Sequence, residues 1–183
     1  EIPKIYKTRE NARIRLRDEL NVPQKTKIAL CVGRIVFYRR QDFLIDAFLK
    51  KNYYENLLLL VVGEPDYSVP STFEIVENIN KSLKNKSKNN RVKLLGHRKD
   101  IFNIMLGSDL FVHPTDMEGF GLTLVEAMYA GLPIVASKVE AIPEIVPSKG
   151  NILFEKDDKD ALIKSIFQII KTPNNLLKEI SKR

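Results

Sequence analysis

The run Leu57–Val62 (LLLLVV) constrains the fold of this chain more than any other feature. Successive side chains of a strand point to opposite faces, so six apolar residues in a row need cover on both faces. Strands of this kind belong to parallel sheets that lie between two layers of helices. The run is also far shorter than the roughly 20 residues that cross a bilayer. The sequence therefore predicts a buried parallel strand.

Helical and strand-like segments alternate around this run. Apolar residues at helical spacing mark residues 9–20, 42–51, 71–84, 100–106, 122–130 and 160–171. Strand-like runs occupy residues 27–32, 57–62, 91–95, 109–113, 133–137 and 151–154. In the segment 71–84, Ser71 and Glu74 have capping-box spacing, and Phe73, Val76, Ile79 and Leu83 would share one face. The alternation predicts an α/β fold, a Rossmann-like doubly wound parallel sheet of about six strands with helices on both faces.

Length and composition fit one globular domain of 183 residues. We expect a lead-in helix and connection over residues 1–26, a Rossmann-like core over 27–171 and a C-terminal helical stretch over 172–183. Hydrophobic residues make up 44% and charged residues 29%, which excludes disordered, collagen-like and disulfide-stapled classes. The single cysteine, Cys31, is expected in the core. We predict a cytoplasmic location.

The net charge of +7 is unevenly distributed. Residues 1–99 carry 21 Lys or Arg against 11 Asp or Glu, whereas residues 100–183 carry 9 against 12. A basic half indicates an anionic partner, such as a phosphorylated small molecule, nucleic acid or an anionic membrane. The alternative is that part of the excess, including Lys81, Lys84, Lys86 and Lys88, only solvates the end of a helix.

Two loops after strands have the composition of a phosphate site, and ligands of such sheets bind at the carboxyl ends of the strands. The first loop begins at Gly33 and holds Arg34, Arg39 and Arg40, whose guanidinium groups can grip a diphosphate. The second is Glu118-Gly119-Phe120-Gly121, which leads into a helix whose N-terminus favours anions. Because Glu118 would repel an anion, we expect it to face ligand hydroxyl groups.

Three further side chains are candidates with alternatives. Glu126 is a carboxylate in an apolar helical run and needs either a ligand or a salt bridge to a basic side chain. His97 follows the strand of residues 91–95, where a loop could read a nucleobase edge, or it has no special role. His113 ends another strand and either contacts a sugar or phosphate or is a satisfied structural histidine.

Together these residues resemble the C-terminal domain of family 4 retaining glycosyltransferases, one half of a GT-B fold. The segment DLFVHPTDMEGFGLTLVEAMYAGLPIVASKVEAIPEIV is similar to the signature of that family, in which two glutamates have seven residues between them, here Glu118 and Glu126. LLLLVVGEP, with Gly63, resembles its second nucleotide-side strand and turn, and VKLLGHRKDI, with His97 and Arg98, its base-contacting segment.

The resemblance implies roles for individual residues. Arg34 and Arg39 would hold the donor diphosphate, Glu126 the ribose, and Glu118 the transferred sugar. The amides of Phe120, Gly121 and Leu122 would line the sugar and phosphates, with Thr123 near the helix start. Where the family has lysine and glycine, this chain has Arg39 and Arg40, so which of the two arginines binds the diphosphate stays open.

The resemblance also implies substrates and partners. The donor would be a UDP-, GDP- or ADP-sugar, with no metal and no other cofactor required. The reaction would transfer a hexosyl group with retention in polysaccharide or glycolipid biosynthesis. The acceptor-binding N-terminal domain would be missing from this chain, which would be inactive alone. The charge, rather than the resemblance, suggests a further hypothesis, in which the rest of the basic half makes a peripheral contact with an anionic membrane.

Other classes fit the sequence less well. An NAD-dependent oxidoreductase would need a G-x-G-x-x-G fingerprint after the first strand, and the chain has none there. A glycoside hydrolase could use Glu118 and Glu126, but it would leave the arginine loop without a purpose. A non-catalytic nucleotide or polyanion binding module would explain the charge. We expect no nucleic-acid partner, because the basic segments lack interleaved aromatic residues.

Overall fold

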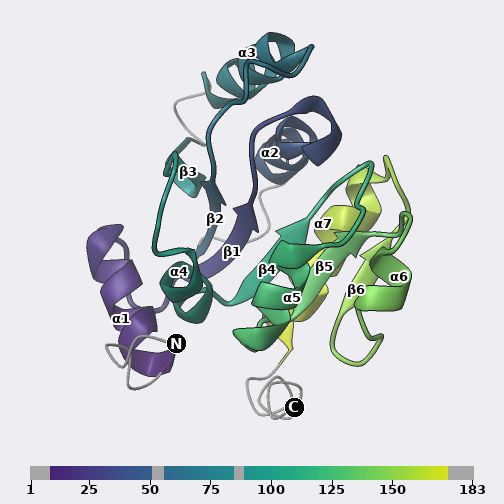
Figure 1. Ribbon diagram of the computed structural model, residues 1–183. Helices are drawn as coiled ribbons and strands as arrows, with labels where there is room; N and C mark the ends of the chain where they lie inside the picture. Colours follow the sequence, from purple (N-terminus) through teal and green to yellow (C-terminus); the bar gives the residue numbers. More distant parts are fainter. Residues whose placement is uncertain (1–8, 51–55, 85–88, 173–183) are drawn as a thin grey trace.

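A six-stranded parallel sheet forms the centre of the computed structural model, which describes residues 9–50, 56–84 and 89–172 (Figure 1). Its strands are β1 (Lys27–Val32), β2 (Leu57–Val62), β3 (Val92–Leu94), β4 (Leu110–His113), β5 (Ile134–Ser137) and β6 (Ile152–Phe154). Their order is β3-β2-β1-β4-β5-β6, and every pairing is parallel. The predicted α/β doubly wound fold is confirmed. The strand order reverses between β1 and β4, where ligands of such sheets bind.

Helices cover both faces of the sheet (Figure 1). They are α1 (Arg9–Glu19), α2 (Gln41–Lys50), α3 (Thr72–Leu83), α4 (Ile101–Gly107), α5 (Leu122–Tyr129), α6 (Ile142–Ile145) and α7 (Lys159–Lys171), with 3-10 turns η1 (Phe37–Arg39) and η2 (Asn89–Arg91). One hydrophobic core lies beneath α2, α3 and α7, and a second lies beneath α1, α4, α5 and α6. Among the described residues no helix is long and apolar enough to span a membrane.

Strand β2 shows why its six apolar residues are needed. Leu57, Leu59 and Val61 pack into the core beneath α2 and α3, whereas the alternate residues Leu58, Leu60 and Val62 pack into the other core. All six are at most 2% exposed. Cys31 in β1 is buried as predicted, and burial raises the pKa of its thiol to about 12.

Helix α3 departs from the prediction. Ser71 precedes the helix with a left-handed φ of 67° and its side chain makes no capping hydrogen bond, so the capping box is wrong. The buried face holds Thr72, Ile75 and Ile79, while Phe73 is 74% exposed. Helix α6 was missed because four residues are too few to show a period. The helical stretch expected after Thr172 lies outside the described residues.

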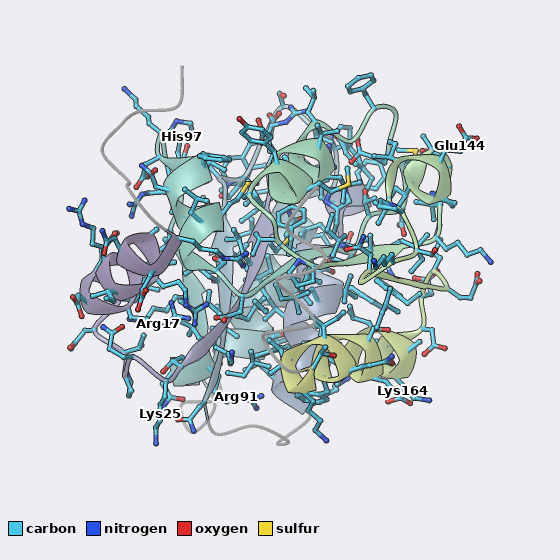
Figure 2. The ribbon with its side chains drawn as sticks, turned by 90° about the horizontal axis from the view of Figure 1, so that it is seen from below. Arg17, Lys25, Arg91, His97, Glu144 and Lys164 are labelled. Atoms are coloured by element: carbon cyan, nitrogen blue, oxygen red, sulfur yellow. The ribbon has the colours of Figure 1, made fainter. Side chains whose placement is uncertain are left out.

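A buried ion pair fixes α1 against the sheet. Arg17 is 1% exposed and donates to Asp109 Oδ2 at 2.6 Å and to the carbonyls of Thr26 and Gly107, both at 2.9 Å. Figure 2 shows Arg17 on the inner side of α1. Burial raises the pKa of Asp109, but the charge of Arg13 and hydrogen bonds from Arg13 and the Ile28 amide outweigh it and hold this pKa below its usual value.

Gly63, which directly follows β2, allows the close backbone packing at the sheet edge to be tested. Gly63 has a φ of +142°, and a Cβ there would lie 1.9 Å from the carbonyl oxygen of Gly33. We expect Gly63→Ala to lower the free energy of unfolding by about 3 kcal/mol or more, through backbone strain and overlap. Gly119→Ala is the control because a Cβ at Gly119 meets nothing within 4 Å. Similar urea midpoints for both variants would contradict this prediction.

Candidate functional site

The loops after β1, β2 and β3 meet at the carboxyl edge of the sheet. The amide of Gly33 donates to Val62 O at 2.9 Å, and the amide of Gly63 donates to Gly96 O at 2.8 Å. These loops line a cleft of about 460 Å³ together with Arg34, Tyr67 and His97. Gly33, Gly63 and His97, which the sequence singled out from separate segments, therefore border the same cleft.

Arg34 lies at the mouth of this cleft. Its side chain is 64% exposed and forms a salt bridge with Asp66, and its Nη2 donates to the Tyr38 hydroxyl at 3.3 Å. The buried amide of Gln41 supports the loop by donating to Arg34 O at 2.9 Å and to Gly33 O at 3.3 Å. Exposed ion pairs contribute little to stability, so an incoming anion can compete with Asp66 for the guanidinium.

Arg39 reaches the end of β4 and the loop before α5. Its Nη1 donates to Glu118 Oε2, and the same oxygen lies 2.7 Å from His113 Nε2. Glu118 is 7% exposed and His113 is 2% exposed. Three residues from one sheet edge thus form a cluster, which we call the Glu118 cluster: Arg39, His113 and Glu118.

The charges of the Glu118 cluster follow from its geometry. Burial lowers the pKa of His113, so the imidazole is neutral and carries its proton on Nε2, the nitrogen that faces the carboxylate. The hydrogen bond from His113, with the charge of Arg39, lowers the pKa of Glu118 to about 2. Arg39 Nη1 and His113 Nε2 lie 3.2 Å apart but are both donors, and they share the acceptor Glu118 Oε2.

The second oxygen of Glu118 binds the turn that starts α5. Gly121 N donates to Glu118 Oε1 at 3.0 Å, and Gly121 has a left-handed φ of 68°. A Cβ at Gly121 would lie 3.0 Å from Leu124 Cδ1, so the turn favours glycine in both conformation and space. Both carboxylate oxygens of Glu118 are therefore held by protein donors.

Helix α5 presents the remaining residues of this loop. Phe120 and Leu122 are 71% and 65% exposed, and Thr123 is half-buried. Glu126 is exposed, and its carboxylate has no hydrogen bond or ion pair within the described part of the chain. The salt bridge that one alternative gave Glu126 is therefore not found among those residues.

The guanidinium groups of Arg40 and Arg98 pair with carboxylates outside the Glu118 cluster. Arg40 forms salt bridges with Asp157 and Asp116, so it does not join the Glu118 cluster. Arg98 borders the cleft, but it bonds Asp100 and Glu19. His97 is exposed and lies at the surface near α4 (Figure 2).

Sequence reasoning missed two carboxylates at this edge, Asp66 and Glu140. Asp66 holds Arg34, and Glu140 Oε2 accepts from the amide of Glu118 at 2.5 Å. Single acidic residues in loops have no periodicity or spacing that could reveal them. Within the described residues, no group of three or more His, Cys, Asp or Glu side chains is arranged to hold a metal ion.

Comparison with known proteins decides the family. The model of the family "Glycosyl transferases group 1" matches residues 12–183. This chain belongs to that family. The D-inositol 3-phosphate glycosyltransferase of Corynebacterium efficiens is 32% identical over 143 residues, which are 75% of this chain and 32% of that protein.

Solved structures agree with this assignment to the glycosyltransferases. HepE of Anabaena in complex with UDP and glucose has a TM-score of 0.82 at 26% identity, over 94% of this chain and 45% of HepE. The C-terminal domain of LpcC, a group 1 protein of Francisella tularensis, has the same fold, with a TM-score of 0.77 at 21% identity over 97% of this chain and 89% of that domain. By this comparison, the chain spans less than half of the length of HepE.

The buried histidine predicts a pH-dependent stability for this glycosyltransferase chain. Because burial lowers the pKa of His113 below its ordinary value of 6.5, the unfolded chain takes up a proton at this residue at a higher pH than the folded chain does. The free energy of unfolding should thus fall as pH drops below about 6.5, by at most about 1.4 kcal/mol per pH unit from this group. Glu118 adds a loss only as pH falls below 4.5 toward about 2.

Urea unfolding at pH 7.0, 6.0 and 5.0 measures this slope. His113→Gln should flatten it, whereas His97→Gln, which removes the other histidine of the chain from an exposed position, should retain it. An unchanged slope in His113→Gln would show that His113 is not the titrating group.

Proposed function

We propose that this chain is the donor-binding domain of a retaining glycosyltransferase. It would bind a nucleotide diphosphate sugar, and the full enzyme would transfer the hexosyl group to a sugar, lipid or polysaccharide acceptor. The observation that carries this proposal is the contact of Arg39 with Glu118 beside the start of α5, with Arg34 in the same loop as Arg39, at the point where the strand order reverses. Family membership and the UDP complex of HepE support it.

The diphosphate would lie between the arginine loop and α5. Among the described residues, the guanidinium of Arg39 donates a hydrogen bond from Nη1, to Glu118. Its Nε and Nη2 protons are therefore left for phosphate oxygens. Arg34 is exposed, and α5 adds the positive end of its dipole. As the sugar C1–O bond breaks, negative charge grows on the leaving diphosphate, and these donors would stabilise it electrostatically.

Glu118 fits the sugar end of this site better than it fits acid catalysis. A glycoside hydrolase needs a carboxylic acid with a raised pKa to protonate the leaving group. The pKa of Glu118 is instead lowered to about 2, so it stays ionised and accepts hydrogen bonds. Glu126, exposed on α5, would accept hydrogen bonds from the ribose hydroxyl groups. We further propose that a second, acceptor-binding domain completes the enzyme and that this chain alone binds donor without transfer.

The cytoplasmic location and the contact with an anionic membrane stay predictions from the sequence. A non-catalytic polyanion or nucleotide binding module is the competing function. Titration with labelled DNA separates a polyanion module from a nucleotide-sugar site, because only the former should bind DNA with an affinity comparable to that for a nucleotide.

Calorimetry with UDP, GDP, ADP and their sugars tests the donor site. We expect at least one nucleotide to bind and Arg39→Ala to weaken it about tenfold or more, because each charge-assisted hydrogen bond is worth about 1.5–3 kcal/mol. Arg34→Ala should act in the same direction. Lys164→Ala, on the outer side of α7 (Figure 2), is the control. No binding by any nucleotide, together with no effect of Arg34→Ala, would exclude the proposed function.

Glu126→Gln tests the ribose contact separately. The amide accepts hydrogen bonds from ribose hydroxyls more weakly than a carboxylate does, so the affinity for nucleotides should fall several-fold, about 1 kcal/mol. Inorganic pyrophosphate has no ribose, and its affinity should change little. Equal losses for both ligands in calorimetry would refute the assigned role of Glu126.

A further inference from the structure

Arg40 has a backbone conformation that arginine rarely adopts. It ends the turn η1 at φ 56° and ψ 32°, in the left-handed region. There the Cβ of an L-residue crowds the neighbouring carbonyl, and glycine is the residue that avoids this strain. Strained residues persist only where surrounding interactions hold them, and they gather near functional sites. Arg40 directly follows Arg39, so an interaction that holds it also acts on the diphosphate loop.

The side chain of Arg40 connects three segments. It forms a salt bridge with Asp157 in the loop between β6 and α7, and its Nε lies 3.7 Å from Asp116 Oδ2 in the loop after β4. The guanidinium carbon also lies 4.9 Å from the ring centre of Phe43 in α2. Asp157 itself has a left-handed φ of 65°. Both ends of this ion pair are thus strained residues in loops at the site edge.

Backbone contacts hold η1 from the other side. Tyr38 O accepts hydrogen bonds from the amide of Asp116 at 2.7 Å and from the hydroxyl of Thr115 at 2.9 Å. Arg39 therefore lies between two fixed neighbours, Tyr38 and Arg40, and its side chain leaves the turn toward Glu118. If Arg40 released Asp157, the second of these anchors would be lost.

We propose that Arg40 is a positioning residue, which clamps η1 to the loops after β4 and β6 so that Arg39 lies at the diphosphate site. Arg40 itself does not bind the diphosphate. The inference rests on the proposed function only in that Arg39 is taken as the diphosphate ligand. It also gives a reason for an arginine where the resembling family has glycine: its side chain joins the turn to Asp157, Asp116 and the Phe43 ring, which glycine could not do.

The substitution Asp157→Asn separates positioning from direct binding. If Arg40 positions Arg39, weakening its partner should raise the Kd for UDP about threefold to tenfold, as expected for residues of one ion-pair network. If Arg40 were a direct ligand, the freed guanidinium would bind UDP equally well or more tightly. Arg40→Gly, which suits the left-handed backbone, should also weaken UDP, and the double variant should be no weaker than Arg40→Gly alone.

Glu155→Gln is the matched control, since Glu155 is a carboxylate of the same loop that pairs with Lys138 instead. It should leave the Kd for UDP unchanged. A Kd in Asp157→Asn or Arg40→Gly equal to that of the unaltered chain would overturn the proposal. If the unaltered chain bound no nucleotide at all, the proposed function would fail instead.

A second measurement needs no ligand. The Arg39 Nε–H signal in the NMR spectrum of the free chain should shift or broaden in Arg40→Gly and Asp157→Asn, but not in Glu155→Gln, because the first two variants release η1. An unchanged Arg39 signal in all three variants would overturn the positioning role.

Discussion

The buried carboxylate of Glu118 sets the geometry of the site. A carboxylate withdrawn from water is costly unless it is paired and hydrogen-bonded. At 7% exposure, Glu118 meets that requirement with Arg39, His113 and the amide of Gly121. These donors come from the loop after β1, the end of β4 and the start of α5. One charge therefore joins the loop after β1 to the connection between β4 and α5, since Arg39 and Glu118 are 79 positions apart in sequence.

The sheet and the helices that cover it could be predicted from the sequence. The spacing of apolar residues in helices and the apolar runs of strands both follow directly from which residues are buried. Leu57–Val62 is the clearest case, since its two faces enter two different cores. The same reasoning failed at α3, where Ser71 has a backbone conformation that prevents capping and Phe73 lies outside the buried face. The spacing of apolar residues therefore predicts where a helix forms more reliably than it predicts which of its residues are buried by neighbouring elements.

The sequence predicts where the site lies in the fold better than it predicts which side chains contact one another there. Arg39 meets Glu118, and Arg34 lies in the same loop as Arg39, because the carboxyl ends of parallel strands share one edge. The partner of each charged side chain depends on loops distant in sequence, which no spacing encodes. Thus Arg98 bonds Glu19 and Asp100, and Arg40 bonds Asp157. Among the residues that the structure describes, Glu126 has no salt-bridge partner.

The charge division of the chain illustrates the same limit. The basic excess of residues 1–99 suggested an anionic partner, yet several of its cations neutralise carboxylates within the fold. Arg13, Arg17 and Lys27 all lie within 3.5 Å of Asp109, a residue of the acidic half. Part of the excess therefore holds the two halves of the chain together. Lys86 and Lys88 lie outside the described residues.

The adjacent residues Arg39 and Arg40, at the end of η1, show how two departures from one family pattern fit each other. Lysine has a single nitrogen, which would have to divide its protons between Glu118 and a phosphate. The guanidinium of Arg39 can keep Nη1 on Glu118 and turn its other donors toward an anion, but only if the planar fork is held in one orientation. A flexible glycine at position 40 would hold that orientation poorly. The strained, ion-paired Arg40 limits the freedom of the turn, so a directional ligand at 39 favours a rigid neighbour at 40.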